Sequence, residues 1–344
     1  MKHKIAVIEG DGVGHEIIPA ALSVLSKFNT NNIKKRKTNT DFDHQFELIP
    51  FNIGYGRWER DGIAMTDEDL DRISKCDCVL FGAITTPPDP EYKSVLLRLR
   101  KELDLYANIR PIKSLLPNAN PIDFVIVREN TEGMYSGIEE IGKDVSTTTR
   151  VITRKGSQRI AESACEIAKK RKGELTIVHK SNVLKSDKLF LDVCIETTKN
   201  SGVSYTDNLV DSMAYKLVRD PTCVDVIVTT NLFGDILSDM AATFVGGLGM
   251  CASANIGNNH ALFEPIHGSA PDIAGKGLAN PIAAILSVRM MLEWMGIPEA
   301  SVIDDAIVHA LQAGVRTPDL GGTATTNEMA EGIAKWVEEL LQAL

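Results

Sequence analysis

Two aspartates, Asp235 and Asp239, lie four residues apart in the mostly apolar stretch TTNLFGDILSDMAATFVGG, residues 229–247. Residues at this spacing share one face of a helix, where two carboxylates repel each other unless a cation lies between them. Mg²⁺ and Mn²⁺ bind carboxylate oxygens and keep coordination places for water and substrate. The pair therefore indicates a divalent-metal site, but acidic side chains are also stabilised by the dipole at the start of a helix. The spacing alone leaves both explanations open.

Six further polar residues could serve the same chemistry. Arginines bind carboxylates through two parallel hydrogen bonds, and a lysine or a tyrosine can move protons when desolvation shifts its pKa. The residues concerned are Arg100, Arg110, Arg128, Tyr135, Lys180 and Asp211. Together with the two aspartates they suit the oxidation and decarboxylation of an acidic hydroxy acid. Each arginine taken alone is more typical of a surface residue, so the prediction depends on their convergence.

Short apolar runs alternate with helical patterns along the chain, and many of the candidate residues follow the runs. We expect strands over residues 5–8, 46–51, 78–82, 124–127, 175–178 and 224–229. We expect helices over residues 17–28, from residue 66 onward, and over 94–101, 282–294 and 326–344. This alternation predicts an α/β fold with a largely parallel sheet. Ligands of such sheets bind at the carboxyl ends of the strands, where the turn-rich loop 82–90 follows the third strand.

The first predicted strand ends in a glycine-rich turn, GDGVGHE at residues 10–16. A dinucleotide fingerprint of the form G-x-G-x-x-G needs a third glycine where His15 stands. We therefore interpret the segment as a tight strand-to-helix turn that could touch a cofactor. The polar segment 29–45, with basic residues at 34–37, is expected to be a loop, and we assign it no function.

Composition excludes some classes of function. The 344 residues carry a formal net charge of −9, which argues against a nucleic-acid-binding surface. No apolar run reaches the roughly 20 residues that cross a bilayer, so no membrane segment is expected. The six scattered cysteines match no zinc-binding spacing and are expected to be reduced, mostly buried thiols, as in the cytosol. The N-terminal residues lead directly into the first strand, so we expect no signal peptide and a cytoplasmic location.

Long motifs make the chain similar to one family over nearly its whole length. The motifs are GDGVGHE, LRKELDLYANIRP, VRENTEGMYSG, HKSNVLK, TTNLFGDILSD, FEPIHGSAPDIAGKGLANP and RTPDLGG. They resemble the β-decarboxylating dehydrogenases, which include isocitrate, 3-isopropylmalate and homoisocitrate dehydrogenases. The resemblance implies a two-domain fold like that of isopropylmalate dehydrogenase, with a mostly parallel sheet in the large domain, and not a Rossmann fold. Residues 1–105 with 246–344 would form the large, NAD-binding domain, and residues 106–245 a small domain with the dimer contacts, the metal ligands and the catalytic residues.

The resemblance also implies a substrate and a metal site. The three residues that would bind the carboxylates of a malate-type substrate are Arg100, Arg110 and Arg128. Family members are homodimers or larger homo-oligomers, and each active site borrows residues from the neighbouring subunit. Asp235 and Asp239, together with Asp211 of the partner subunit, would hold Mg²⁺ or Mn²⁺.

Two residues would carry the proton transfers that the resemblance implies. Lys180 of the partner subunit would deprotonate the substrate hydroxyl. Tyr135 would protonate the enol that remains after CO₂ leaves. Both are side chains whose pKa responds to burial and to neighbouring charge, as such roles require.

The cofactor follows from the motif HGSAPDIAGKGLANP, residues 267–281. By resemblance Asp272 stands where the adenosine ribose would lie, and a carboxylate there accepts hydrogen bonds from ribose hydroxyls but repels a 2′-phosphate. NAD is therefore expected rather than NADP. The other residues expected to line the adenosine site are His267, Gly268, Ser269, Ala270 and Asn280.

Members of the family differ in the third substituent of the malate. The predicted helix 94–101 places Leu96 and Leu97 on the face of Arg100, where they would form an apolar wall, and Val183 also fits an apolar pocket. A carboxylate buried against two leucines costs several kcal/mol, and isopropylmalate enzymes carry such a leucine pair. The chain is thus expected to convert 3-isopropylmalate to 2-oxo-4-methylpentanoate in leucine biosynthesis.

Other residues keep alternatives open. Isocitrate enzymes have a serine at the place of Ser94, which would also lie against the substrate, and Lys93 or Lys185 could meet a third carboxylate. Homoisocitrate or isocitrate is therefore the alternative substrate. A more remote alternative is a non-catalytic regulatory subunit of isocitrate dehydrogenase, in which catalytic side chains are lost. All eight candidate positions are intact here, which disfavours that class.

Overall fold

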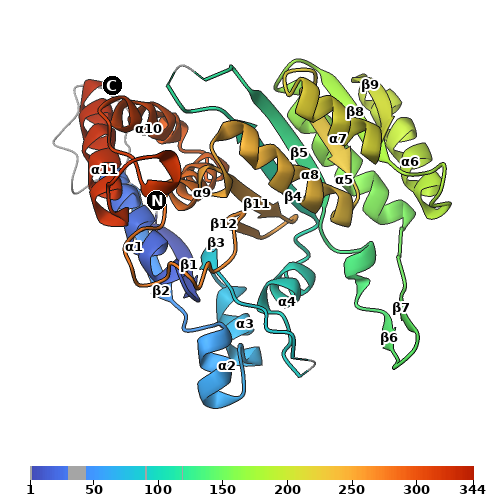
Figure 1. The fold of residues 1–344 in the computed structure, drawn as a ribbon, viewed down its shortest axis with the longest axis horizontal. Coiled ribbons are helices and arrows are strands. Elements are labelled where there is room, and N and C mark those ends of the chain that lie inside the picture. The colour runs from blue at the N-terminus through green and yellow to red at the C-terminus, as the bar shows by residue number, and fades with distance from the viewer. Residues whose placement is uncertain (1, 30–43, 90, 118) are drawn as a thin grey trace.

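The computed structural model describes residues 2–29, 44–89, 91–117 and 119–344. The chain folds around a ten-stranded sheet that extends through the whole molecule (Figure 1). In spatial order the strands are β2 (Gln45–Pro50), β1 (Lys2–Gly10), β3 (Cys78–Ala83), β12 (Ala261–Pro265), β11 (Ala252–Ile256), β4 (Ala107–Lys113), β5 (Asp123–Glu129), β10 (Val226–Thr229), β8 (Glu174–His179) and β9 (Ser204–Leu209). The predicted loop with the basic residues 34–37 lies outside the described residues.

The sheet is parallel at both ends and antiparallel in the middle. At one end β1 pairs in parallel with β2 and β3, and β3 with β12; at the other, β10 pairs in parallel with β5 and β8, and β8 with β9. The pairings β12–β11, β11–β4 and β4–β5 between them are antiparallel. The predicted α/β fold with a mostly parallel sheet is confirmed, and the strand order is not that of a Rossmann fold.

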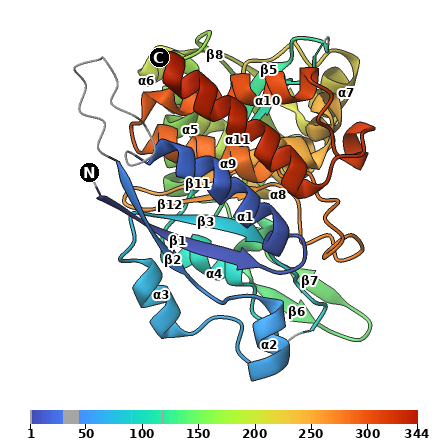
Figure 2. The same ribbon diagram turned by 90° about the vertical axis from the view of Figure 1, so that its left-hand side faces the viewer.

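Two groups of helices cover opposite faces at the end that contains β1 (Figures 1 and 2). One group is α1 (Gly14–Leu25), α9 (Ile282–Trp294), α10 (Val302–Gln312) and α11 (Thr326–Ala343); the other is α2 (Tyr55–Asp61), α3 (Asp67–Ile73) and α4 (Val95–Glu102). Ile5 and Val7 of β1 pack into the core under the first group, while Ala6 and Ile8 pack into the core under the second. This alternation is what a strand buried on both faces requires.

The other end of the sheet is covered in the same way. Helices α5 (Arg154–Lys169) and α6 (Ser186–Ser201) cover one face, and α7 (Val210–Arg219) and α8 (Asn231–Ala242) the other. Val125 and Val127 of β5 pack into the core with α5 and α6, while Phe124 and Ile126 share a core with Leu237 of α8. A small hairpin of β6 (Glu139–Ile141) and β7 (Ser146–Thr148) projects from this end (Figure 1).

Three further expectations concern the chain as a whole. The six cysteines are free thiols, all buried except Cys223, as predicted. Within the described ranges, no helix combines the length and the apolar character that a bilayer crossing needs. The division into residues 1–105 with 246–344 and residues 106–245 stays a prediction, since the sheet continues from β11 to β4 across that boundary.

Candidate active site

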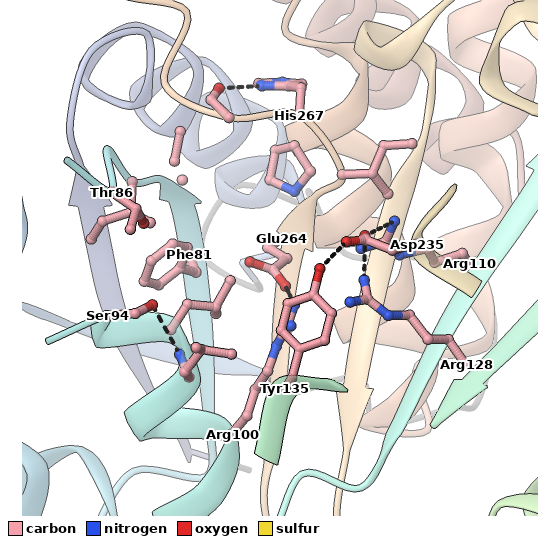
Figure 3. Close-up of a pocket in the computed structure, with 18 residues that line it drawn as sticks. Phe81, Thr86, Ser94, Arg100, Arg110, Arg128, Tyr135, Asp235, Glu264 and His267 are labelled. Atoms are coloured by element: carbon pink, nitrogen blue, oxygen red, sulfur yellow. Dashed lines mark hydrogen bonds and ion pairs between the residues drawn. The ribbon is translucent and has the colours of Figure 1, made fainter. Parts of the chain in front are cut away.

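A cleft of about 320 Å³ opens beside the antiparallel middle of the sheet (Figure 3). Ten residues proposed from the sequence line it: Ser94, Leu96, Leu97, Arg100, Arg110, Arg128, Tyr135, Asp235, His267 and Gly268. They come from α4, β4, β5, α8, the 3₁₀ turn Met134–Ser136 and the loop after β12. The arginines, the tyrosine and the aspartate gather on one side, and Ser94 and Phe81 lie on the other.

Helix α4 delivers Arg100 to the cleft. The helix begins after Ser94, whose hydroxyl accepts a hydrogen bond from the backbone N–H of Leu97 and caps the first turn. Arg100 lies in the last turn, where a cation is favoured by the helix dipole. Its guanidinium is buried and donates to Oε1 of Glu264 at 3.1 Å, and its Nε has no hydrogen-bond partner in the protein. One buried donor of this guanidinium is therefore left without a partner in the protein.

Arg110 and Arg128 come from the neighbouring antiparallel strands β4 and β5 and point at α8. Nη1 of Arg110 donates to Oγ of Ser238 at 2.6 Å and lies 3.3 Å from carboxylate oxygens of both Asp235 and Asp239. Arg128 pairs with Asp235. Burial, with the nearby Arg110 and Arg100, lowers the pKa of Arg128 against the pull of Asp235, but a guanidinium remains charged at neutral pH.

Close approach of α8 to Arg128 depends on a glycine. A Cβ at Gly234 would lie 2.6 Å from Cγ and 2.7 Å from Cβ of Arg128, closer than carbon atoms can pack. One turn earlier, Oδ1 of Asn231 accepts hydrogen bonds from Nε and Nη2 of the same arginine, at 3.1 and 2.7 Å. Gly234 and Asn231 therefore fix the distance between Arg128 and the aspartates of α8.

The two aspartates of α8 lie in different electrostatic environments. Burial would raise the pKa of Asp235, but Arg128 and Arg110 outweigh it and hold that pKa below its ordinary value. The pKa of Asp239 is raised, because its burial and the negative charge of Asp235 exceed the effect of Arg110. A bound divalent cation would offset the mutual repulsion of the pair, as the helical spacing predicts.

Tyr135 donates a hydrogen bond from its hydroxyl to Oδ2 of Asp235 at 2.7 Å (Figure 3). Partial burial and this hydrogen bond raise the pKa of Tyr135 above its ordinary value. The hydroxyl is therefore protonated at neutral pH and able to act as a proton donor toward the cleft.

Lys180 and Asp211 lie together but outside this cleft. Lys180 follows β8, and Asp211 is in the first turn of α7; the two form an ion pair. The hydrogen bond from Lys180 is the main reason why the pKa of Asp211 is lowered. In the part of the chain that the structure describes, no three acidic, histidine or cysteine side chains gather into a metal site. One copy of the chain thus brings Asp235 and Asp239 together and leaves Asp211 elsewhere.

The loop after β12 is tied to two other loops at the rim of the cleft. Oγ of Ser269 lies 2.7 Å from the hydroxyl of Thr85. The backbone carbonyl of Ser269 accepts a hydrogen bond from the backbone N–H of Val13 at 2.9 Å. Ala270 has a φ of 39°, a left-handed conformation that a side chain rarely adopts. The GDGVGHE turn, the end of β3 and the proposed adenosine site are therefore neighbours.

The remaining proposed cofactor residues differ in their exposure and in their hydrogen bonds. Burial lowers the pKa of His267, although the carbonyl of Gly268 accepts from its ring at 2.9 Å and opposes the shift. Asp272 is exposed. The amide of Asn280 donates to Asp319 at 3.0 Å and accepts from the backbone of Ile282.

Three residues weighed for substrate specificity do not line the cleft. Val183 is 64% exposed, and Lys93 and Lys185 are exposed side chains. Phe81 and Ile84 line it instead, beside Leu96 and Leu97. The sequence interpretation also missed Glu264, Asn231 and Ser238, which accept hydrogen bonds from the three arginines. The one sequence feature that could have indicated them is a polar residue within or beside a segment expected to be buried.

The sequence is similar to one family of known enzymes. A sequence model of the isocitrate/isopropylmalate dehydrogenase family matches residues 4–333. The isocitrate/homoisocitrate dehydrogenase of Thermus thermophilus is 46% identical over 348 residues, which cover 99% of this chain and 100% of that protein. The 3-isopropylmalate/3-methylmalate dehydrogenase of Methanocaldococcus jannaschii is 45% identical, over 98% of this chain and 99% of that protein.

A solved structure agrees with these relatives. The β-decarboxylating dehydrogenase from Thermococcus kodakarensis, in its apo form, superposes with a TM-score of 0.84 at 45% identity, over 98% of this chain and 97% of that one. Nearly the whole chain thus matches in sequence and in fold. It belongs to the isocitrate/isopropylmalate dehydrogenase family and is a β-decarboxylating dehydrogenase.

Proposed function

We propose that the enzyme catalyses the NAD-dependent, divalent-metal-dependent oxidative decarboxylation of 3-isopropylmalate to 2-oxo-4-methylpentanoate, in leucine biosynthesis in the cytoplasm. The observation that carries the proposal is the composition of the cleft. Three buried guanidinium groups meet a tyrosine and an aspartate on one side, and an apolar wall lies on the other. Such a site suits an anionic hydroxy acid with one apolar substituent.

Arg100, Arg110 and Arg128 would bind the two carboxylates of the malate core. Charge-assisted hydrogen bonds of this kind are about twice as strong as neutral ones, and they fix orientation when they are bidentate. Because all three guanidinium groups are buried, their charges are weakly screened by solvent.

Asp235 and Asp239 would hold Mg²⁺ or Mn²⁺, with Asp211 of the partner subunit. Their side chains are partly exposed, at 32% and 52%, so a ligand can approach both carboxylates. The oxygens of Asp235 already accept from Arg128 and Tyr135, and a bound ion would share them. Such an oxygen donor set, completed by water and substrate, is the coordination that hard divalent ions prefer. When bound, the ion stabilises negative charge on the substrate oxygen as a Lewis acid.

The proton transfers would involve one residue from each subunit. Lys180 of the partner subunit would accept the proton of the C2 hydroxyl, while bound NAD supplies the acceptor for the C2 hydride. The C2 ketone then takes the electron pair of the breaking carbon–carbon bond as CO₂ leaves. Tyr135 would donate its proton to the resulting enol at carbon, for which its raised pKa keeps it protonated.

A homodimer with shared active sites is supported by surfaces near Lys180 and Asp211. Helices α7 and α8 expose large apolar side chains, among them Tyr215, Val218 and Ile236, at 66%, 63% and 60%. Exposed apolar residues on adjacent helices are typical of a contact with another protein. We propose that a second copy covers them and that this contact brings its Lys180 and Asp211 to the cleft.

The proposed cofactor choice predicts the effect of one substitution. Asp272→Ala is expected to raise the KM for NAD about 10-fold and to raise activity with NADP, since it removes the carboxylate that would accept from the ribose and repel a 2′-phosphate. Initial rates with each cofactor measure both effects. Asp305→Ala, which removes an exposed carboxylate of α10, serves as the control. Unchanged KM values in the Asp272 variant would show that the ribose binds elsewhere.

A tricarboxylate such as homoisocitrate is the second candidate substrate. The hydroxyl of Ser94 lines the cleft beside the leucines, and the Thermus relative is an isocitrate/homoisocitrate dehydrogenase. Against this candidate, the lysine and arginine side chains that line the cleft, among the residues that the structure describes, are the three arginines already assigned to the malate core. Leu96 and Leu97 would leave a third carboxylate unpaired, which favours the alkyl substrate.

Leu97→Arg tests this assignment, because Leu97 lines the cleft and is 39% exposed. We expect kcat/KM for 3-isopropylmalate to fall by at least about 10-fold, as an apolar contact is lost, and kcat/KM for homoisocitrate to rise. Leu48→Arg adds the same charge to an exposed position of β2 and should change neither value. A Leu97 variant that keeps the wild-type preference would exclude this leucine from the substituent site.

The reaction itself is tested by its stoichiometry. With 3-isopropylmalate, NAD and Mg²⁺, NADH and CO₂ should form in equal amounts, and a chelator should stop both. NADH without CO₂ would indicate a simple alcohol dehydrogenase. Formation of neither product from any substituted malate would overturn the proposed function.

A further inference from the structure

Arg100 and Arg110 are joined by a chain of buried polar side chains. Nε of Arg110 donates to Oδ1 of Asn108 at 2.6 Å, and Nδ2 of Asn108 donates to Oδ1 of Asn255 at 2.9 Å. Nδ2 of Asn255 donates to Oε1 of Glu264 at 2.7 Å, the same oxygen that Arg100 contacts at 3.1 Å. None of these five residues is more than 6% exposed.

The strand register explains how this row of hydrogen-bonded side chains forms. Asn255 of β11 lies directly opposite Asn108 of β4, and on its other side opposite Leu262 of β12. Glu264 is two residues further along β12, so it shares a face with Asn255 as a diagonal neighbour. Asn255 therefore occupies the central position, between the strand that carries Arg110 and the strand that carries the counter-ion of Arg100.

Asn255 bonds to both its neighbours in the orientation that Arg110 and Glu264 require. Its Oδ1 holds the amino end of Asn108, which leaves the carbonyl end of Asn108 to face Arg110. If the amide of Asn108 were turned over, its NH₂ group would meet the guanidinium of Arg110, donor against donor. On the other side, the NH₂ group of Asn255 holds the carboxylate of Glu264 against Arg100. Buried chains of this kind rigidify a site when each member is satisfied.

We propose that Asn255 is a positioning residue for substrate binding, which holds Arg100 and Arg110 in a fixed relation through Glu264 and Asn108. The proposal rests on the proposed role of these arginines in binding the malate carboxylates. Asn255 itself does not line the cleft. Its removal should therefore weaken the binding of a dicarboxylate without a comparable effect on NAD.

The test is calorimetric binding of malate, the core that the candidate substrates share, to the protein with Mg²⁺. Asn255→Ala is expected to raise the Kd for malate between about 10-fold and 100-fold, as the loss of a supporting outer-shell contact does at metal sites. The Kd for NAD should change by less than about twofold, as expected for a distant, independent site. Malate binding within threefold of wild type would overturn the proposal.

A second variant and a control separate positioning from simple destabilisation. Asn108→Ala interrupts the same series of hydrogen bonds between Asn255 and Arg110, so it should weaken malate binding similarly. The double variant should bind malate only slightly more weakly than either single variant. Asn108→Ala also keeps the test decisive if Asn255→Ala does not fold. Asn130→Ala removes another buried amide that donates to Asn255 at 2.9 Å but is not between the arginines. This control should lower Tm and leave the Kd for malate within about threefold.

The outcomes distinguish this proposal from the function on which it rests. If the wild-type protein does not bind malate, the assignment of the arginines is wrong, and the positioning role is overturned with it. If wild type binds malate, and Asn255→Ala and Asn108→Ala bind it as tightly as wild type does, only the positioning role is overturned. Additive losses in the double variant would also contradict it, because they would show that Asn108 and Asn255 act independently.

Discussion

Replacing Asp235 by asparagine is expected to reduce kcat/KM by more than about 100-fold, beyond the usual cost of losing an outer-shell partner at a metal site. The carboxylate is one of two that one subunit would offer to the metal. It also accepts hydrogen bonds from Arg128 and from Tyr135, so its charge orients a substrate arginine and the proposed proton donor. NADH formation measured as a function of Mg²⁺ concentration should show a lower maximal rate and a higher metal requirement.

A matched substitution separates this effect from general destabilisation. Asp304 is a largely buried carboxylate that pairs with Lys113 at 2.7 Å and Arg289 at 2.9 Å, outside the cleft. Asp304→Asn removes the same charge and should lower Tm while leaving the metal dependence of the rate unchanged. Wild-type rates at wild-type Mg²⁺ concentrations in the Asp235→Asn enzyme would exclude Asp235 as a metal ligand.

Mixing two inactive variants is expected to restore activity. Lys180→Met and Asp235→Asn are each expected to inactivate both sites of their own homodimer. We propose that Lys180 acts in the site of the neighbouring subunit, whereas Asp235 acts in the site of its own chain. In a heterodimer of the two variants, both lesions fall in one site, and the other site is intact. Unfolding and refolding an equal mixture makes half of the dimers heterodimers, so activity should return to about a quarter of the wild-type value.

The structure makes this experiment discriminating. Lys180 is paired with Asp211 outside the cleft, whereas Asp235 lines it. A mixture of Asp235→Asn with Tyr135→Phe is the control, since both residues line the cleft of one chain and the heterodimer would have no intact site. If the Lys180 and Asp235 variants do not complement each other, the site is completed within one chain, and the shared-site proposal is wrong.

Much of the outer part of the sheet could be predicted from the sequence. Strands β1, β3, β5, β8 and β10 are continuous apolar runs because helices cover both their faces, and such runs stand out in any sequence. The helix expected from residue 66 onward is confirmed as α3. The structure shows a capping box there, in which the side chains of Thr66 and Asp69 bond to each other's backbone N–H.

The antiparallel middle of the sheet was missed for a physical reason. Strands β4, β11 and β12 bury Asn108, Arg110, Asn255 and Glu264, so they lack the apolar pattern by which buried strands are found. Proline at position 111 also argues against a strand in the interior of a sheet. These polar side chains are tolerated there because they bond to one another, a property of tertiary structure that local periodicity does not contain.

The candidate site could be predicted only in part. Residue types and the spacing of Asp235 and Asp239 pointed to metal and carboxylate chemistry, but they did not show that Arg128 would bond to Asp235 or that Lys180 would lie apart from it. The partners that orient the arginines, such as Asn231 and Ser238, give no signal of their own in one sequence. Their function depends on the packing of α8 against β4 and β5.

NADH formation with NAD and Mg²⁺ should be compared for 3-isopropylmalate, homoisocitrate and isocitrate at equal concentration, because it decides which substrate the enzyme prefers. The leucine wall and the three arginines of the cleft predict the highest kcat/KM for 3-isopropylmalate. A preference for homoisocitrate or isocitrate would contradict the proposed substrate. It would mean that Ser94, or a charged side chain from outside the cleft of one chain, contacts a third carboxylate and that Leu96 and Leu97 do not set the choice of substrate.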